Sequence, residues 1–574
     1  MIILSKLCAV VVLLLTSLVG SPAYDTAIKE TAWVELDVDL DRDGHKDRLA
    51  ADIIRPSSAG RVPVLMDISP YYACCGRGNE AQKKTYDADG KPVAFPLYYD
   101  NYFVPRGYAV LLVDMSGTNR STGCMDDGGP YDLAAGAQVI KWLNGKARAF
   151  SAPFGGTPVS SGWSTGNVGI WGKSHDGWLA NGIATTGVEG LKAVVSIAGV
   201  TDIYQTYNDN GAWVGTYEGG PPLYNERAQK LCKPLEAELA RQKGTSGDWN
   251  RYWQERHYPS KASSVRAAVF ATQGFNDLAV KPTNFSQWWE ALRVPRKAWL
   301  FQGGHADPFD LRRADYVETV GRWFDRWLLG VPNGVEREPA VKIEHAVDEW
   351  RDEPTWPAPG NFRTWWPKSD GTLSGTPSPG TTTFQDDPSV GRFEWLSDDS
   401  LARVLYTSPP LTTDTRLSGV GTVTVTMKSS TPVARVGVLV VDYGPAVIRN
   451  VDFTGKVGIR NLDTRSCWGS SSDVDSACYL DTVPDTVSVD REIVSVAWAD
   501  LGHYASRRHQ VPLRADRYYT MRFDLSPLDH IVPAGHRLGL IIGGTDYWEF
   551  LTPGDRPTLT VNLSQTSLTL PTAH

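Results

Sequence analysis

The stretch GIWGKSHDG (residues 169–177) decides how the first half of this chain folds. It ends an apolar run with a glycine and a Ser-His pair, and the helix-like segment GWLANGIATTG (177–187) follows. A serine on a tight strand-to-helix turn is exposed at the carboxyl edge of a sheet. The stretch therefore predicts Ser174 as a nucleophile, although Gly172 and Gly177 lie one residue further apart than in the pattern Gly-x-Ser-x-Gly. The alternative is an ordinary serine in a glycine-rich turn.

His175 follows Ser174 directly but cannot be its base, because neighbouring side chains on such a turn diverge. The backbone N–H of the residue after the nucleophile usually donates to the oxyanion. The first amides of the following helix point toward the same oxygen. We therefore expect His175 to supply a backbone donor of the oxyanion hole, while its side chain lines the pocket or packs locally.

An acid and a base for Ser174 are expected at the ends of later strands, in the chain order Ser, Asp, His. AAVFATQGFND places Asp277 just after an apolar run, and AWLFQGGHADPF places His305 just after the next. Asp202, in AGVTDIY, is a rival acid at the end of an earlier run. Groups of these types at three strand ends favour a triad of Ser174, Asp277 and His305.

Six short apolar runs in the first half end in turn residues and alternate with helix-length segments. They are VPVLMDIS (62–69), YAVLLVDM (108–115), NVGIWG (167–172), AVVSIAG (193–199), AAVFATQG (267–274) and AWLFQGG (298–304). Such runs are typical of buried parallel strands with crossover helices, so residues 24–345 are predicted to form an α/β domain. Residues 203–262 lack strand-like runs and are predicted to form an inserted helical cap.

The second half changes character after residue 345. Pro/Gly/Thr-rich connectors lead into strand-like runs with almost no helix signal. These runs are TVTVTMKSS (422–430), ARVGVLVVDYG (434–444), REIVSVAWADL (491–501), YYTMRFDLSP (518–527), HRLGLIIGG (536–544) and LTVNL (559–563). Residues 346–574 are therefore predicted to form a β-sandwich of jelly-roll type.

Composition limits the classes of protein and partner. The 574 residues exceed a single domain, and 41% hydrophobic with 21% charged residues is ordinary for a globular protein. A net charge of −8 without a basic block argues against nucleic acid or an anionic membrane surface as a partner. The chain has neither a CxxC pair nor an HExxH motif, so we expect no zinc site and no cofactor. These features do not fix the oligomeric state.

Residues 1–23 have the pattern of a secretory signal peptide. Lys6 precedes an apolar run over Leu7–Val19, and Ser21-Pro22-Ala23 supplies a small-residue cleavage site. The run is shorter than the ~20 apolar residues of a membrane span. We therefore expect a secreted, soluble mature protein with no membrane attachment after signal removal.

An even number of cysteines remains after residue 23, which suggests disulfide bonds in an exported protein. They are Cys74, Cys75, Cys124, Cys232, Cys467 and Cys478. We expect Cys467 and Cys478 to close a loop on themselves. The other four are expected to cross-link the first half, and one arrangement joins the segment after Tyr72 to Cys124 and Cys232.

Four aspartates surround Gly44 in VDLDRDGHKDRLAAD, a pattern that resembles a calcium-binding loop. They are Asp39, Asp41, Asp43 and Asp47. The twelfth position, counted from the first of them, holds Ala50 and so lacks the acidic ligand that such a loop uses. A β-hairpin turn at Asp43-Gly44 explains the same residues. No resident metal is therefore expected, with calcium at this loop as the alternative.

The chain resembles the Xaa-Pro dipeptidyl-peptidase and cocaine-esterase group of α/β-hydrolases. That group uses Gly-x-Ser-Tyr-x-Gly as its elbow, which matches Gly172 to Gly177 except that His175 replaces the tyrosine. Other segments that resemble the group are RLAADIIRP (48–56), SPYY (69–72), GTNRSTG (117–123), FNDLAV (275–280), GGHADPF (303–309), YTSPPL (406–411), LSGVGTVTVTM (417–427) and VPAGHRLGLIIGG (532–544). The resemblance covers nearly the whole chain after residue 23. It implies an α/β-hydrolase fold followed by a C-terminal jelly roll.

The resemblance implies acyl transfer by a serine hydrolase without a cofactor. Asp277 matches the acid motif of the group and His305 its base motif. The Tyr71 hydroxyl is implied as the second oxyanion donor beside the His175 N–H, and ordinary packing is the alternative for this tyrosine. The 117–123 loop is implied to shape the site without taking part in the chemistry.

A small peptide or ester is the implied substrate. Release of N-terminal Xaa-Pro dipeptides is the favoured activity, and a carboxylesterase or α-amino-acid ester hydrolase is the alternative. A peptidase of this type needs a carboxylate for the free α-ammonium group of its substrate. Glu218 and Glu226, in the predicted cap, are the candidates.

A different class is a non-catalytic carbohydrate-binding protein, in which FRTWWP (362–367) faces a glycan. The joint presence of a nucleophile, an acid, a base and an oxyanion donor argues against that class.

Overall fold

The computed structural model describes residues 22–57, 60–74, 76–77, 80–81, 83–213, 223–549 and 555–573. Residues 1–21 of the predicted signal peptide and the candidate Glu218 lie outside these ranges. Within the described ranges, no helix is both long and apolar enough to span a membrane.

An eleven-stranded sheet forms the centre of the first domain, in the order β15-β14-β13-β12-β11-β10-β3-β8-β2-β1-β9. Its strands are β1 (Ile28–Glu35), β2 (Arg48–Arg55), β3 (Val62–Ser69), β8 (Ala109–Asp114), β9 (Ala149–Phe150), β10 (Ser164–Lys173), β11 (Leu191–Ile197), β12 (Ala268–Gly274), β13 (Arg296–Phe301), β14 (Val341–Ala346) and β15 (Glu349–Glu353). The strands from β8 through β3 and β10 to β14 are parallel, and antiparallel strands close both ends. The predicted α/β class is confirmed, and the sheet continues beyond residue 345 to Glu353.

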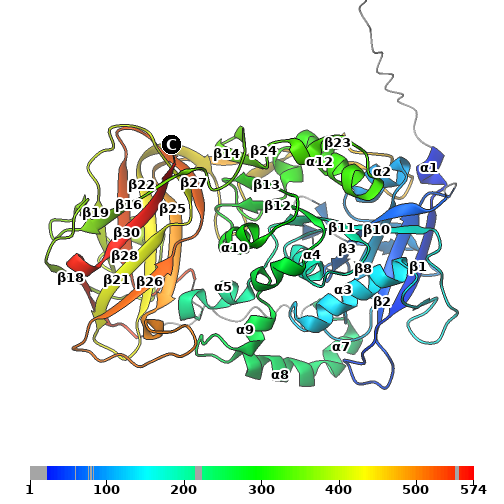
Figure 1. Cartoon of the computed structure of the whole chain (residues 1–574), viewed down its shortest axis with the longest axis horizontal. Coiled ribbons are helices and arrows are strands. Elements are labelled where there is room, and N and C mark those ends of the chain that lie inside the picture. The colour runs from blue at the N-terminus through cyan, green and yellow to red at the C-terminus, as the bar shows by residue number, and fades with distance from the viewer. Residues whose placement is uncertain are drawn as a thin grey trace, which may run out of the picture.

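Helices cover both faces of this sheet (Figure 1). Those that border the site or the core are α2 (Tyr99–Phe103), α3 (Pro130–Leu143), α4 (His175–Thr185), α10 (Thr283–Ala291), α11 (Pro308–Leu311) and α12 (Arg313–Phe324). The apolar side chains of α3, α4 and α10 belong to one buried cluster, and those of α2 and α12 belong to another. The strands are buried on both faces, which explains their continuous apolar runs. Two short ribbons, β4 (Gly76–Arg77) with β5 (Glu80–Ala81) and β6 (Thr85–Tyr86) with β7 (Pro92–Ala94), follow β3.

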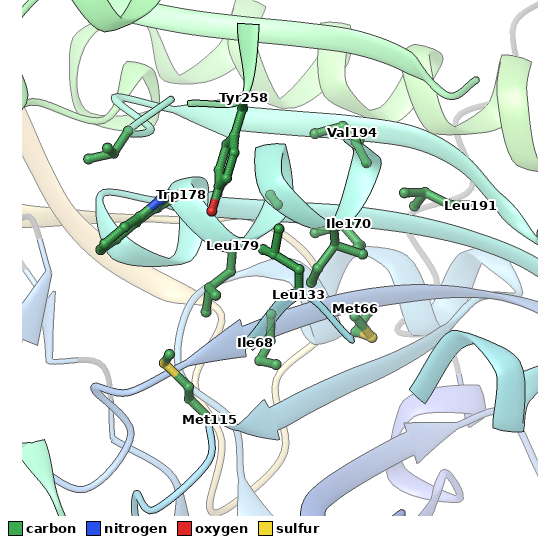
Figure 2. Close-up of a cluster of buried hydrophobic side chains, with 14 of the residues drawn as sticks. Met66, Ile68, Met115, Leu133, Ile170, Trp178, Leu179, Leu191, Val194 and Tyr258 are labelled. Carbon is green, nitrogen blue, oxygen red and sulfur yellow. The ribbon is translucent and has the colours of Figure 1, made fainter. Parts of the chain in front are cut away.

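The first of these clusters fixes the position of α4 over the sheet. Figure 2 shows Leu133 of α3 between Leu179 of α4 and Ile170 of β10. Tyr258 reaches toward Trp178, and its hydroxyl donates to the carbonyl oxygen of Gly128 at 2.6 Å. A close-packed helix has little freedom to shift, so its first residue is held in a fixed place.

The segment between β11 and β12 is helical where the structure describes it. It contains α5 (Ile203–Tyr207), α7 (Glu226–Leu231), α8 (Lys233–Lys243) and α9 (Arg251–Glu255), with the 3₁₀ turns η2 (Asp209–Gly211) and η3 (Pro259–Ser264). Cys232 at the end of α7 is disulfide-bonded to Cys124 in the loop before α3. The arrangement that joined these two cysteines to the segment after Tyr72 is therefore wrong, because they bond to each other.

Two sheets form the second domain. One contains β16 (Gly360–Pro367), β17 (Leu373–Ser374), β18 (Thr381–Gln385), β20 (Thr415–Gly419), β21 (Thr422–Ser429), β26 (Tyr519–Asp524), β27 (Leu528–Val532), β29 (Thr558–Asn562) and β30 (Ser567–Ala573). The other contains β19 (Arg403–Thr407), β22 (Arg435–Arg449), β25 (Thr486–Asp500) and β28 (Arg537–Gly543). Both contribute to one apolar core, so the all-β prediction is confirmed. The jelly-roll order stays a prediction.

Trp365 lies in that core and is only 3% exposed. The FRTWWP segment therefore does not present this indole to a glycan.

A long hairpin of the second domain extends back over the first. It consists of β23 (Ile459–Cys467) and β24 (Cys478–Pro484), and the predicted Cys467–Cys478 disulfide closes it. We call residues 459–484 the clamp hairpin. Figure 1 shows it beside α12, along the upper edge of the first domain in this view.

Several hydrogen bonds tie the clamp hairpin to the first domain. Arg313 of α12 donates to the carbonyl oxygen of Leu480 at 2.7 Å. The Phe95 N–H donates to the carboxylate of Asp475 at 2.9 Å. Asn101 donates to the carbonyl oxygen of Ser470 at 3.0 Å. The two domains therefore share contacts far from the point where the chain passes between them.

Candidate active site

Ser174 occupies a strained turn between β10 and α4. Its φ of 60° and ψ of −120° lie in a region that non-glycine residues rarely adopt. A Cβ on Gly172 would lie 2.5 Å from the carbonyl carbon of Asp176, and one on Gly177 would lie 2.9 Å from the Cα of Gly199. Both glycines are therefore required by close backbone approach, and the wider spacing of the sequence still forms an elbow.

Asp277 and His305 meet in a direct hydrogen bond. The two residues follow the adjacent parallel strands β12 and β13, and the Nδ1 atom of His305 lies 2.8 Å from Oδ2 of Asp277. The other carboxylate oxygen of Asp277 accepts from the N–H groups of Ala279 at 2.9 Å and Val280 at 2.8 Å. A buried carboxylate with these partners can hold one tautomer of the imidazole, with Nε2 left for the nucleophile.

The rival acid Asp202 has a different partner. It caps α5 through the Tyr204 N–H at 3.1 Å, and its carboxylate lies 3.7 Å from Nε2 of His257. Burial raises the pKa of Asp202 to about 7. The partner of His305 is therefore Asp277.

Tyr71 and His175 lie side by side at the end of β3 and the start of α4. Their rings are 6.3 Å apart in an edge-to-face arrangement, and His175 also packs against Trp178 at 5.1 Å. Because β3 and β10 are parallel neighbours, Tyr71 lies at the same sheet edge as Ser174. Tyr71 and the start of α4 therefore meet at the sheet edge that carries Ser174.

The His175 side chain does not act as a base in this arrangement. It is buried, and burial lowers the pKa of the imidazole to about 4, although Asp127 raises it in part. Its Nε2 atom has no hydrogen-bond partner among the described residues. The imidazole is neutral at physiological pH and packs between the rings of Tyr71 and Trp178. This agrees with the expectation that the His175 side chain packs locally.

The aspartates of residues 39–47 form a closed loop after β1. Carboxylate oxygens of Asp39, Asp41 and Asp43 lie within 4.8 Å of one another. The guanidinium of Arg227 forms ion pairs with Asp41 and Asp43. Asp47 is outside the cluster and accepts from the Leu40 N–H at 2.8 Å. A protein cation already balances two of these carboxylates.

The substrate-binding candidates differ in what the structure describes. Glu218 lies outside the described residues. Glu226 is exposed in the first turn of α7.

Two residues around the acid were missed by the sequence reasoning. Gln273 donates to Oδ2 of Asp277 at 3.3 Å and to the carbonyl oxygen of Val280 at 3.0 Å, which closes the turn that carries the acid. Lys281 follows this turn and forms ion pairs with distant carboxylates. The only sequence signal is their position on either side of the FNDLAV motif.

A strained serine elbow and an adjacent Asp-His pair on this sheet define a serine hydrolase of the α/β-hydrolase fold. The family model described as X-Pro dipeptidyl-peptidase (S15 family) matches residues 43–307. The model described as X-Pro dipeptidyl-peptidase C-terminal non-catalytic domain matches residues 333–574.

Relatives with the same name extend over the whole chain. A putative Xaa-Pro dipeptidyl-peptidase of Streptomyces avermitilis is 44% identical over 570 residues, covering 96% of this chain and 84% of the relative. A putative Xaa-Pro dipeptidyl-peptidase of Bacillus anthracis is 33% identical over 583 residues, covering 95% and 88%. The chain therefore belongs to the X-Pro dipeptidyl-peptidase (S15) family.

Solved structures share the fold at low sequence identity. An α-amino acid ester hydrolase has a TM-score of 0.65 at 17% identity and covers 97% of this chain and 99% of its own. A CocE/NonD family hydrolase of Staphylococcus aureus has a TM-score of 0.69 at 15% identity, with coverage of 95% and 94%. Both likenesses concern the arrangement of the two domains.

Proposed function

We propose that this protein is an Xaa-Pro dipeptidyl-peptidase that releases N-terminal Xaa-Pro dipeptides from peptides. The observation that carries the chemistry is the 2.8 Å contact between His305 and Asp277 at the sheet edge of the Ser174 elbow. Family membership and the 44% identical relative support the peptide substrate.

The proposed reaction is acyl transfer. Nε2 of His305 takes the proton of the Ser174 hydroxyl, whose oxygen attacks the carbonyl carbon of the substrate proline. The Tyr71 hydroxyl and the His175 N–H donate to the oxyanion, and His305 then protonates the leaving amine. Water attacks the acyl-enzyme by the same route and releases the dipeptide. The Nδ1 atom of His305 keeps its proton throughout the reaction, because this N–H donates to the carboxylate of Asp277.

Recognition of the free α-ammonium is assigned to Glu218 in this proposal. Since Glu226 is exposed on α7, it offers a matched control of the same type. We expect Glu218→Gln to slow cleavage of Ala-Pro-p-nitroanilide and to leave an acyl ester without an amine unaffected. Glu226→Gln is expected to change neither rate. Equal loss in both variants, or in neither, contradicts the assignment.

A carboxylesterase or α-amino-acid ester hydrolase is the second candidate. The same triad cleaves esters, and the solved α-amino acid ester hydrolase shares the arrangement of both domains. The alternative differs in the leaving group that the site accepts, not in the acyl-enzyme chemistry.

The experiment that tests the function compares three substrates with the mature protein. They are Ala-Pro-p-nitroanilide, N-acetyl-Ala-Pro-p-nitroanilide and a p-nitrophenyl acyl ester, with Ser174→Ala as the control. Cleavage of the free anilide that acetylation abolishes supports the dipeptidyl-peptidase. Ester turnover without cleavage of either anilide assigns the protein to the esterase alternative. Undiminished activity in the Ser174→Ala variant would contradict the proposal that Ser174 is the nucleophile.

Secretion through a signal peptide over residues 1–23 belongs to the same proposal. The disulfides Cys124–Cys232 and Cys467–Cys478 support it, because such bonds persist in oxidising compartments. We expect the native host to release a protein whose N-terminus begins at Tyr24. Recovery of the full-length chain from the cytoplasm alone would contradict export.

A further inference from the structure

The turn that carries Asp277 ends at a buried lysine. We call residues 274–281 the acid loop. Lys281 follows directly on Val280, whose N–H donates to the Asp277 carboxylate at 2.8 Å. The Lys281 side chain is buried, and its ammonium lies 4.9 Å from the ring centre of Trp498 in β25. The acid loop is therefore attached to the second domain one residue beyond the turn that holds the acid.

The Lys281 ammonium joins three parts of the molecule. Its Nζ atom lies 2.6 Å from Oδ2 of Asp209, in the helical segment between β11 and β12. It also lies 2.5 Å from Oε1 of Glu549, in the second domain. Each of these carboxylates is itself buried or nearly so. A buried charge-assisted contact of this kind fixes position more strictly than a surface ion pair does.

The second domain holds Glu549 from its other side. Arg392 donates to Oε2 of Glu549 at 2.5 Å and pairs with Oδ2 of Asp546 at 2.7 Å. The Trp498 indole donates to the same Asp546 oxygen at 3.0 Å. We call Lys281, Glu549, Arg392 and Asp546, together with Asp209, the latch. Arg392 therefore holds the Glu549 side chain in the position from which it contacts Lys281 of the acid loop.

Electrostatics keep the central groups of the latch charged. Burial alone lowers the pKa of Lys281, but Asp209 and Glu549 raise it above its ordinary value. Burial likewise opposes ionisation of Glu549, yet Lys281 and Arg392 hold its pKa below the ordinary value. For Asp209, burial outweighs the lysine and raises the pKa to about 6. The acid loop is therefore joined to the second domain by an ion pair between Lys281 and Glu549, with opposite charges on both groups.

A pocket lies between the acid loop and the second domain. It has a volume of about 250 Å³, and its walls include Phe275, Asp277, Leu278, Ile493, Val496 and Trp498. Lys281 also lines this pocket, so its contact with Glu549 joins the two walls.

We propose that Lys281 is a positioning residue for the triad and that the second domain, through Glu549, holds the catalytic acid in register with His305. The domain that the matching family model describes as non-catalytic thus supplies a contact on which the reaction rate depends. This inference rests on the proposed triad and adds a function for the second domain.

The test measures kcat and KM for the p-nitrophenyl ester and the rate of labelling by a fluorophosphonate. Lys281→Met and Glu549→Gln should each lower kcat by about 10- to 100-fold with KM nearly unchanged, as expected for a displacement of roughly 1 Å at the reacting groups. The double variant should be no slower than Lys281→Met alone. Lys281→Met already removes the contact between Lys281 and Glu549 that Glu549→Gln weakens. Lys281→Arg keeps the charge and should recover part of the lost rate.

A matched control is Lys297→Met. Lys297 is another buried lysine with a carboxylate partner, Glu338 at 3.2 Å, but it lies in β13 away from the acid loop. The Lys297→Met variant should have a lower melting temperature, but the folded enzyme should keep the kcat of the unchanged protein. If Lys281→Met behaves in the same way, or if the double variant shows additive losses, the latch is structural only and the inference is wrong.

The proposed site can fail separately from the latch. Labelling that persists in the Ser174→Ala variant would refute the triad itself. Labelling lost in that variant but undiminished in Lys281→Met would refute only the positioning role.

Discussion

Nδ1 of His305 and Oδ2 of Asp277 lie 2.8 Å apart at the ends of two neighbouring strands. The contact is built by the sheet, since strands that run parallel bring their following loops to one edge. We expect Asp277→Asn to lower kcat by about 10⁴-fold, because the amide favours the wrong tautomer of His305. Turnover of the p-nitrophenyl ester by the folded variant checks this. A fall of less than tenfold would contradict the assignment of the acid.

Tyr71 and His175 are expected to respond differently to substitution. Tyr71→Phe removes an oxyanion donor and should lower kcat by about 10²- to 10³-fold. His175→Tyr restores the residue of the related elbow and keeps the backbone N–H, so activity should stay within about tenfold of the original. Ester kinetics of both variants give the answer. Equal losses would mean that the His175 side chain takes part in the reaction.

The pH dependence of stability should contain a contribution from His175. Burial lowers the pKa of its imidazole from 6.5 to about 4 in the folded protein. Its contribution to stability is therefore complete above pH 6.5 and is lost as the pH falls toward 4. Urea unfolding at pH 7.5 and pH 4.5 should show a smaller acid loss in His175→Phe than in the unchanged protein. Equal acid losses would contradict the lowered pKa.

The two described disulfides should contribute unequally to stability. Cys124–Cys232 spans 108 residues and Cys467–Cys478 spans 11. Chain entropy gives about 4.7 kcal/mol for a loop of ~100 residues and about 3 kcal/mol for one of ~15. The double alanine variant of the first pair should therefore melt at the lower temperature. Calorimetry of both double variants measures the order, and the reverse order would show that local strain or packing dominates.

Chelation is expected to leave the melting temperature unchanged. Arg227 already supplies positive charge to Asp41 and Asp43, so the loop needs no ion to balance them. Melting with EDTA, and with added calcium after EDTA, checks this. A rise of several degrees with calcium would show that the loop binds the ion.

The elbow and the contact between Asp277 and His305 could be predicted because their signals are local. Each of Ser174, Asp277 and His305 follows a short apolar run that ends in turn residues, a pattern typical of a buried parallel strand. The strand β15 was not predicted, since EWRDE (349–353) is a polar edge strand without an apolar run. Edge strands of this type carry charge because one side faces water.

Connections between distant segments could not be predicted. Four cysteines allow three pairings, and the sequence does not choose among them, so the Cys124–Cys232 bond was missed. The partners of Lys281 are likewise set by the packing of two domains, and nothing near FNDLAV indicates a carboxylate at Glu549. Burial of this lysine is visible only in the folded chain.

The clamp hairpin has a mechanical consequence. It bonds to the first domain at Arg313, Phe95 and Asn101, beside α12 (Figure 1). Opening of the two domains about their connecting segment would break these bonds, which opposes a hinge motion at the domain boundary. The domains should accordingly unfold in one cooperative transition rather than two.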